Sequence, residues 1–393
     1  MTNDTKNLFE ENIQNTEISN NFSENNTTGI VPSQKIRKLI LDKTIISLES
    51  TIEENQIQPA SIDLRLSSKA YRVRASFLPG KNSTVQKKLN DYGMHEIDLL
   101  NGAVLEKGAV YIVPLQESIS LTKRYSGIAN PKSSIGRLDI FTRLITDNCE
   151  EFDRVNNGYK GKLYAEISPR TFSIVVRKGS KLLQLRIRKG SPRPSDSATR
   201  RLHDKVSLIE SSLSDKEVSK RIRNGVPVSI NLSNYNEIIG YKAKNFTPLI
   251  DIDKVNFYQI SDFWEPIFSS NNNSIILDPN AFYILASKEA LTVPPNHAAE
   301  MEAFNPLHGE FRVHYAGFFD PGFGHSTTGG SGSKAVLEIR SYEVPFLLED
   351  GQVVCRLIYE RLTEDPDKLY GANTLNSNYQ AQKLKLSKHF KSE

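Results

Sequence analysis

The chain has 393 residues, of which 38% are hydrophobic and 24% charged, a composition typical of a globular protein with room for two domains. Its 50 basic and 46 acidic residues give a net charge of +4, which weakly favours an anionic ligand and does not by itself indicate nucleic acid binding. The two cysteines are far apart, no signal sequence is recognisable, and no apolar run reaches about 18 residues. We therefore expect a cytoplasmic protein that does not span a membrane and binds no nucleic acid.

The first 29 residues are rich in Asn, Thr, Ser and Glu and contain few apolar anchors. This composition predicts a disordered tail over residues 1–29. In the next segment, "VPSQKIRKLILDK", Ser33 is a suitable N-cap and Ile36, Leu39 and Ile40 share one helical face. We expect a short amphipathic helix to open the folded part.

An internal repeat follows this helix, in a region of short alternating strands separated by Gly, Pro and Asn. "LEKGAVYIVPL" resembles "LDPNAFYILAS", and "LYAEISPR" resembles "AVLEIRSY", both at a spacing of 172 residues. "SIDLRL" recurs as "SINLSN" at a slightly different spacing. The repeat predicts two tandem β domains, 30–190 and 225–365, a charged linker, 191–224, and a C-terminal lid or tail, 366–393.

One carboxylate recurs in the repeat. In "KGKLYAEISPR" the alternation puts Tyr164 and Glu166 on the face opposite Leu163, Ala165 and Ile167. A single glutamate on a strand commonly faces solvent. Its recurrence as Glu338 argues for a retained role.

The sequence carries no zinc-deaminase signature. Its seven histidines and two cysteines do not form the His-x-Glu and Pro-Cys-x-x-Cys pattern that activates water against a nucleobase. We expect no zinc site, so a glutamate with a raised pKa would have to activate any such water.

The stretch "NPKSSIGRLD" concentrates groups that suit a phosphate. One helical turn would bring the hydroxyls of Ser133 and Ser134 and the guanidinium of Arg137 to one side. Gly136 permits close backbone approach, and Lys132 adds a mobile charge. The hexapeptide alone leaves two interpretations open, a phosphate clamp and a capped surface turn.

Four segments occur in the order found in one enzyme family: "QPASIDLRL", "NPKSSIGRL", "NGYKGKLYAEI" and "SNYQAQ". In them the chain resembles the dCTP deaminases of the dUTPase-like superfamily, and its length resembles the long tandem bacterial form. The resemblance implies an all-β dominated fold of two tandem dUTPase-like distorted jelly-roll (β-clip) domains with a few short helices. It also implies a catalytic first domain, a degenerate second repeat and a homotrimer with active sites between neighbours.

The same resemblance implies hydrolysis of dCTP to dUTP and ammonia, which feeds dUMP and dTTP synthesis. Glu166 would be the general base that activates water at cytosine C4, and Ser133 and Arg137 would be the other catalytic groups. The implied substrate contacts are Lys132, Ser134, Gly136, Thr146, Asn156, Tyr159, Tyr379 and Gln382. Mg²⁺ would enter bound to the triphosphate, and dTTP is the inhibitor that the resemblance suggests.

The two repeats depart from the family pattern in opposite ways. The first has Asn156 where the family hairpin has an aspartate, which argues against dUTP hydrolysis there. The second restores the acid as Asp320 in "FFDPGFG" and keeps Glu338, but it has no Ser-Ser-x-x-Arg motif. Either the second repeat is a remnant, which we favour, or Asp320 and Glu338 face Ser133 and Arg137 across an interface.

Two other functions stay open. One is dUTP diphosphatase, alone or combined with deamination. The other is a non-catalytic nucleotide-binding regulatory module, against which the retained Ser133, Arg137 and Glu166 argue.

Overall fold

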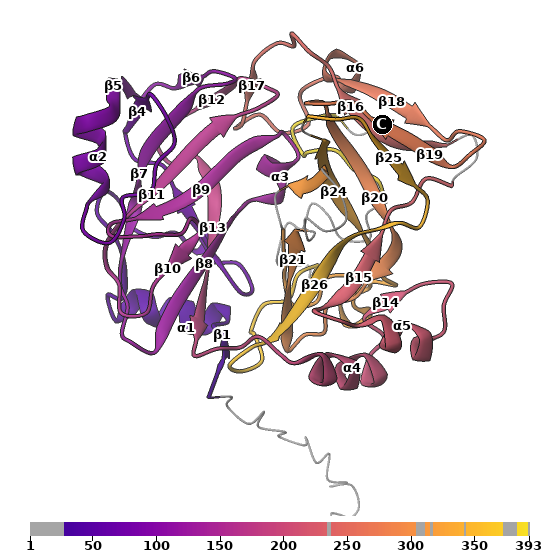
Figure 1. Ribbon diagram of the computed structural model, residues 1–393. Coiled ribbons are helices and arrows are strands. Elements are labelled where there is room, and N and C mark those ends of the chain that lie inside the picture. The colour runs from indigo at the N-terminus through magenta and orange to yellow at the C-terminus, as the bar shows by residue number, and fades with distance from the viewer. Residues whose placement is uncertain are drawn as a thin grey trace, which may run out of the picture.

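The computed structural model describes residues 27–233, 237–303, 311–314, 317–341, 343–371 and 383–391 (Figure 1). The expected architecture is confirmed, because the chain folds into two β-rich bodies with a few short helices between and around the strands. None of the helices in these residues is long and apolar enough to cross a membrane. The predicted tail lies outside the described residues up to residue 26, and its last residue, Gly29, already belongs to the first strand.

The first domain is built from a five-stranded sheet, β1-β13-β8-β10 with β3 on β13, and a six-stranded sheet, β5-β4-β7-β11-β9 with β2 on β7. Its strands are β1 (Gly29–Ile30), β2 (Ile45–Ser47), β3 (Ile62–Arg65), β4 (Lys69–Val73), β5 (Gly93–Asp98), β6 (Ala103–Leu105), β7 (Val110–Ser120), β8 (Tyr125–Pro131), β9 (Ile140–Thr146), β10 (Arg154–Val155), β11 (Lys160–Pro169), β12 (Ile174–Val176) and β13 (Lys181–Lys189). Its helices are α1 (Ser33–Leu41), η1 (Glu54–Gln56), α2 (Val85–Tyr92) and α3 (Ser133–Gly136). The α1 helix forms where the sequence predicts it, with Ile36 and Leu39 buried.

The second domain repeats this arrangement, with a sheet β18-β16-β20-β24-β22 and a sheet β15-β26-β21-β23. Its strands are β14 (Ile209–Glu210), β15 (Val226–Ser229), β16 (Ile238–Ala243), β17 (Ile250–Asp251), β18 (Trp264–Phe268), β19 (Ser274–Leu277), β20 (Phe282–Leu291), β21 (His297–Ala303), β22 (Phe311–His314), β23 (Phe318–Phe319), β24 (Ser333–Ser341), β25 (Phe346–Glu349) and β26 (Val353–Arg361). Its helices are α4 (Asp196–Lys205), α5 (Asp215–Arg221), α6 (Ile260–Phe263) and η3 (Ser326–Thr328).

Strand pairing corrects one part of the predicted repeat. Arg65 of β3 pairs with Lys181, and Ser229 of β15 pairs with Val353, the repeat counterpart of Lys181. Ser229 therefore occupies the position of Arg65, and the segment "SINLSN" begins at the end of its strand instead of filling it. Sequence similarity aligned the two segments in the wrong register, because both contain alternating apolar residues and such a pattern is compatible with more than one strand register.

The segment 191–224, which the sequence predicts as a charged linker, contains regular structure. It forms α4, β14 and α5, and Ile209 of β14 pairs with Leu291 of β20. Leu208, Val218 and Ile222 are buried in the second core. These apolar residues are spaced among many charges, and through them the segment packs on the second domain.

Aromatic side chains join the two domains. Phe172 of the first domain meets Phe263 and Trp264 of the second edge to face, with ring centroids 5.6 and 5.4 Å apart. Phe390 from the C-terminal segment packs on the same rings. The β17 strand of the second domain also pairs in parallel with β12 of the first. Buried aromatic pairs stabilise a contact beyond the effect of the apolar area that they bury, so these rings stabilise the packing of the two domains against each other.

Candidate functional site

The "KSSIGR" stretch forms the single helical turn that the sequence predicts. It starts directly after β8, and the amide of Arg137 donates to the carbonyl of Ser133 at 3.1 Å. Ser134 and Arg137 are buried, whereas Lys132 and Ser133 are partly exposed. In Figure 1 this turn, α3, lies at the junction of the two domains, next to β24. It is thus positioned to work with groups of the second domain.

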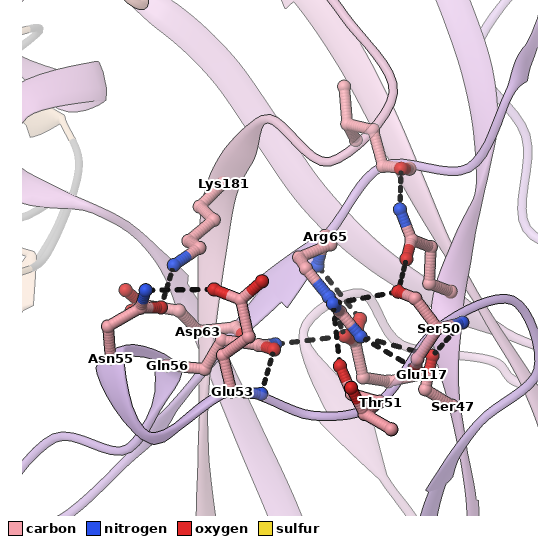
Figure 2. A network of polar contacts seen from close by, with 12 residues as sticks. Ser47, Ser50, Thr51, Glu53, Asn55, Gln56, Asp63, Arg65, Glu117 and Lys181 are labelled. Carbon is pink, nitrogen blue, oxygen red and sulfur yellow. Dashed lines mark hydrogen bonds and ion pairs between the residues drawn. The ribbon is translucent and has the colours of Figure 1, made fainter.

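A buried polar network around Arg65 and Asp63, shown in Figure 2, connects to this turn through Lys132. Lys132 forms an ion pair with Asp63 of β3, and the carbonyl of Asp63 accepts a hydrogen bond from Gln56 at 2.9 Å. Gln56 also donates to Glu117, which binds the side chain of Arg65 at 2.8 Å. Arg65 and Glu117 have almost no solvent exposure, and Arg65 makes further bonds to the loop that precedes β3. The network therefore holds β3, and with it Asp63, in one position.

The second domain contributes Glu338 to the same place. On β24 the side chains of Val336, Glu338 and Arg340 face the first domain, and Oε1 of Glu338 lies 3.9 Å from Nε of Arg137. Burial raises the pKa of Glu338 to about 8, although the nearby Arg137 guanidinium opposes this shift. A glutamate that gains and loses its proton near neutral pH is suited to general acid–base chemistry.

The acidic hairpin of the second domain is also directed at the first domain. Asp320 is buried, and its Oδ1 accepts a hydrogen bond from Arg186 of β13 at 3.1 Å. Burial raises the pKa of Asp320, and the Arg186 guanidinium acts against that rise; Asp63 and Lys132 are close enough to influence the same carboxylate. The two domains therefore bring Asp63, Lys132, Asp320 and Arg186 into one neighbourhood.

Glu166 has a different environment from its counterpart Glu338. On β11 it lies opposite Arg143 of β9, whose Nη2 is 2.6 Å from Oε1 of Glu166. Arg143 also donates to Ser76 and stacks 3.4 Å from the centre of the Phe152 ring. The cation next to Glu166 therefore comes from its own sheet, whereas the cation next to Glu338, Arg137, comes from the other domain.

Three of the remaining predicted contacts of the first repeat, Thr146, Asn156 and Tyr159, lie around the β9–β11 connection. Thr146 ends β9 and is buried, and Asn156 is exposed in the hairpin, where its carbonyl accepts from the amide of Tyr159. The hydroxyl of Tyr159 donates to the carbonyl of Lys162 at 2.6 Å, and burial raises the pKa of this tyrosine. Gly136 is buried within α3.

The C-terminal segment packs directly on the α3 turn. Nη1 of Arg137 donates to the carbonyl of Lys385 at 2.8 Å, and the hydroxyl of Ser387 donates to the carbonyl of Ser134 at 2.7 Å. Burial and the charge of Lys132 lower the pKa of Lys388, which places this lysine within electrostatic reach of the turn. Tyr379 and Gln382, the predicted lid residues, lie outside the described residues.

Sequence reasoning missed three participants: Asp63, Arg186 and the carbonyl of Lys385. Asp63 stood in a quoted motif but was treated only as part of a strand. Arg186 lies at a polar position of an alternating strand, and this alternation is the one local feature that sets its side chain apart from the apolar core. A backbone carbonyl has no signal in sequence at all.

No group of three or more His, Cys, Asp and Glu side chains in the described part of the chain is arranged to hold a metal by itself. Both cysteines, Cys149 and Cys355, are buried and free. One oxygen has a bearing on a magnesium nucleotide: among the residues that the structure describes, Oδ1 of the buried Asp63 has no hydrogen-bond partner. Oxygen ligands are the ones that Mg²⁺ prefers, so this one oxygen has the chemistry of a ligand to a metal that arrives with a triphosphate.

Comparison with known proteins covers almost the whole chain. Residues 27–191 match the N-terminal domain, and residues 195–390 the C-terminal domain, of 2′-deoxycytidine 5′-triphosphate deaminase. The chain belongs to the dCTP deaminase family.

Solved and curated relatives agree with this assignment. A crystal structure of 2′-deoxycytidine 5′-triphosphate deaminase from Agrobacterium tumefaciens is 54% identical, with a TM-score of 0.80, and the match covers 86% of this chain and 99% of that one. A dUMP-forming dCTP deaminase from Methanosphaera stadtmanae is 26% identical over 43% of this chain and 89% of its own length. A dCTP deaminase from Natronomonas pharaonis is 25% identical over 48% of this chain and 89% of its own length. The family and fold expected from the sequence are therefore confirmed.

Proposed function

We propose that this dCTP deaminase family member hydrolyses dCTP to dUTP and ammonia at a composite site between its two domains. The first domain would supply the Ser133–Arg137 turn and the second would supply Glu338 and Asp320. The observation that carries the proposal is the buried Glu338 carboxylate, 3.9 Å from Arg137, with a pKa raised by burial to about 8.

Glu338 would act as the general base. In its ionised form it takes a proton from a water molecule whose oxygen bonds to C4 of the cytosine ring, and it delivers that proton to N3. It then moves the remaining hydroxyl proton to the exocyclic amino group, which leaves as ammonia while the C4 carbonyl forms. A pKa near 8 serves both halves of this cycle, because the group must accept a proton and then return it. Arg137 would stabilise the ionised carboxylate between the two transfers.

Glu166 is less suited to this role, although the family resemblance implied it. Its ion pair with Arg143, whose Nη2 lies 2.6 Å from Oε1, occupies one carboxylate oxygen. We therefore assign the base to Glu338. Glu166 is its counterpart in the first repeat, and the second repeat has no Ser-Ser-x-x-Arg motif to face it.

Positive groups around α3 would bind the triphosphate. Lys132 and the hydroxyls of Ser133 and Ser134 come from the turn, and Lys385 and Lys388 come from the C-terminal segment. Mg²⁺ would neutralise part of the phosphate charge, and Asp63 would hold it through the carboxylate oxygen that lacks a partner. Binding of this kind orients the base-bearing end of the nucleotide toward Glu338.

A second candidate reaction is hydrolysis of dUTP to dUMP and pyrophosphate in the same site. Two features favour it: some relatives are named dUMP-forming, and Asp320 restores the hairpin acid that Asn156 replaces in the first repeat. Measuring dUMP and pyrophosphate alongside ammonia distinguishes the two reactions. Formation of ammonia and dUTP in equal amounts, without dUMP, would show that the chain deaminates dCTP and does not hydrolyse dUTP.

The direct test is to incubate the full chain with dCTP and Mg²⁺ and to measure ammonia and dUTP. The unsubstituted protein should form both in equal amounts, and Glu338→Gln should form neither while still binding dCTP. If the unsubstituted protein binds dCTP but releases no ammonia, the chain is a nucleotide-binding module and the proposal fails. We also propose the homotrimer, which a molar mass from light scattering would test.

A further inference from the structure

Arg186 lies outside every motif of the sequence, yet it reaches across the domain junction. On β13 the side chains of Leu183, Leu185 and Ile187 point into the first core, and Arg186 points the other way, toward the second domain. Only 1% of Arg186 is exposed. Burying a guanidinium so completely is unfavourable unless the groups around it compensate, so its partners must matter to the fold or to the site.

Those partners belong to the acidic hairpin of the second domain. Nη2 of Arg186 donates to the carbonyl of Phe319 at 2.9 Å and to Oδ1 of Asp320 at 3.1 Å. Nη1 donates to the carbonyl of Ala299 at 2.7 Å, and the guanidinium lies 4.0 Å from the centre of the Phe318 ring. A planar donor fork that binds a carboxylate and two carbonyls at once restrains both the backbone and the side chain of the hairpin.

The two repeats differ at this position in a consistent way. Arg186 pairs with Ile128 of β8, and Ile358 pairs with Glu300 of β21, so Ile358 is the counterpart of Arg186. Ile358 belongs to the second repeat. The hairpin of the first repeat has Asn156 where the second has Asp320, so it offers no acid for a residue at the position of Ile358 to bind. The arginine is therefore present for the hairpin that keeps its acid and absent for the one that has lost it.

We propose that Arg186 is a positioning residue that holds the Phe318–Asp320 hairpin beside the α3 turn and fixes the orientation of the Asp320 carboxyl group at the composite site. This inference rests on the proposed function for its effect on catalysis. The restraint on the hairpin does not depend on that function and can be measured separately.

The experiment compares Arg186→Met with Arg188→Met in the full chain. Arg188, two residues further along β13, also crosses the junction, but its ion pairs are with Glu300 and Glu360 and not with Asp320. We expect Arg186→Met to lower kcat/KM for dCTP at least tenfold and to speed hydrogen exchange over residues 318–324. We expect Arg188→Met to leave both within about twofold of the unsubstituted protein, and Arg186→Lys to recover part of the loss.

A double-mutant cycle separates positioning from a general structural effect. If Arg186 acts through Asp320, Arg186→Met should have almost no further effect on kcat/KM in the Asp320→Asn background. The proposal would be overturned if the fold-losses in kcat/KM from Arg186→Met and Asp320→Asn simply multiplied in the double variant. It would also be overturned if Arg186→Met and Arg188→Met showed the same rate of hydrogen exchange over residues 318–324. If Arg186→Met does not fold, Arg186→Lys against Arg188→Lys gives the same comparison. If the unsubstituted protein releases no ammonia, the proposed function fails, while the exchange data still decide whether Arg186 restrains the hairpin.

Discussion

Replacing Glu338 with Gln should make the protein more stable at neutral pH while removing its activity. Burial raises the pKa of Glu338 from its usual 4.5 to about 8, so the folded state binds this proton more tightly than the unfolded chain does. Between about pH 4.5 and pH 8 the unfolded chain releases this proton while the folded protein keeps it, so the free energy of unfolding falls as the pH rises. The glutamine has nearly the same shape and never ionises, so it escapes this penalty.

The size of the effect follows from the shift. Each pH unit between the unfolded and folded pKa contributes about 1.4 kcal/mol, so ionisation of Glu338 costs about 3 kcal/mol at about pH 7. For domains of about 150–250 residues, 1 kcal/mol moves the melting temperature by about 2–4 °C, which gives a rise of roughly 6 °C or more for Glu338→Gln. The difference between the two proteins should shrink toward zero as the pH is lowered to about 4.5.

Differential scanning calorimetry between about pH 5 and pH 8 measures this difference, with Glu166→Gln as the matched control. Glu166 is equally buried but is paired with Arg143, so its replacement should lower the melting temperature at every pH in this range. The reasoning would be refuted if Glu338→Gln melted below the unsubstituted protein at neutral pH, or if its advantage did not change with pH.

Three further substitutions test the supports of the site. Arg65→Met leaves the Glu117 carboxylate buried without its cation and should lower the free energy of unfolding by about 3–5 kcal/mol; a loss below about 1 kcal/mol in urea titration would contradict the role of this pair. Arg137→Lys keeps a charge but loses the fork that binds the C-terminal carbonyl and faces the base, so kcat/KM for dCTP should fall about tenfold or more, and an unchanged value would count against the site. Ser387→Ala removes the bond to the Ser134 carbonyl and should speed proteolysis of the C-terminal segment; an unchanged cleavage rate would show that this bond is unimportant.

Local patterns in the sequence predicted most local structure. The alternation around Glu166, the helical turn at Ser133 and the amphipathic α1 helix all depend on neighbours within a few residues. The tandem repeat was visible for the same reason, since each copy preserves its own alternation. Registers that alternation leaves open, as at Ser229, were not predictable in this way.

Contacts between distant segments explain what the sequence could not reveal. Arg143 reaches Glu166 from a neighbouring strand, and Arg137 reaches Glu338 over about 200 residues of chain, so the different partners of these two equivalent glutamates could not be read from their shared motif. The sequence favours a remnant over the composite site, because duplicated domains commonly keep only one working copy. No local pattern shows which surfaces the aromatic junction around Phe172 and Trp264 brings together.

The most direct test of the composite site is the rate of ammonia release from dCTP and Mg²⁺ by Glu338→Gln and Glu166→Gln, compared with the unsubstituted chain. Each substitution keeps the shape of the side chain and removes its ability to accept a proton. The composite site predicts that Glu338→Gln is inactive and that Glu166→Gln retains measurable deamination. An inactive Glu166→Gln beside a fully active Glu338→Gln would contradict it and return the site to the first repeat.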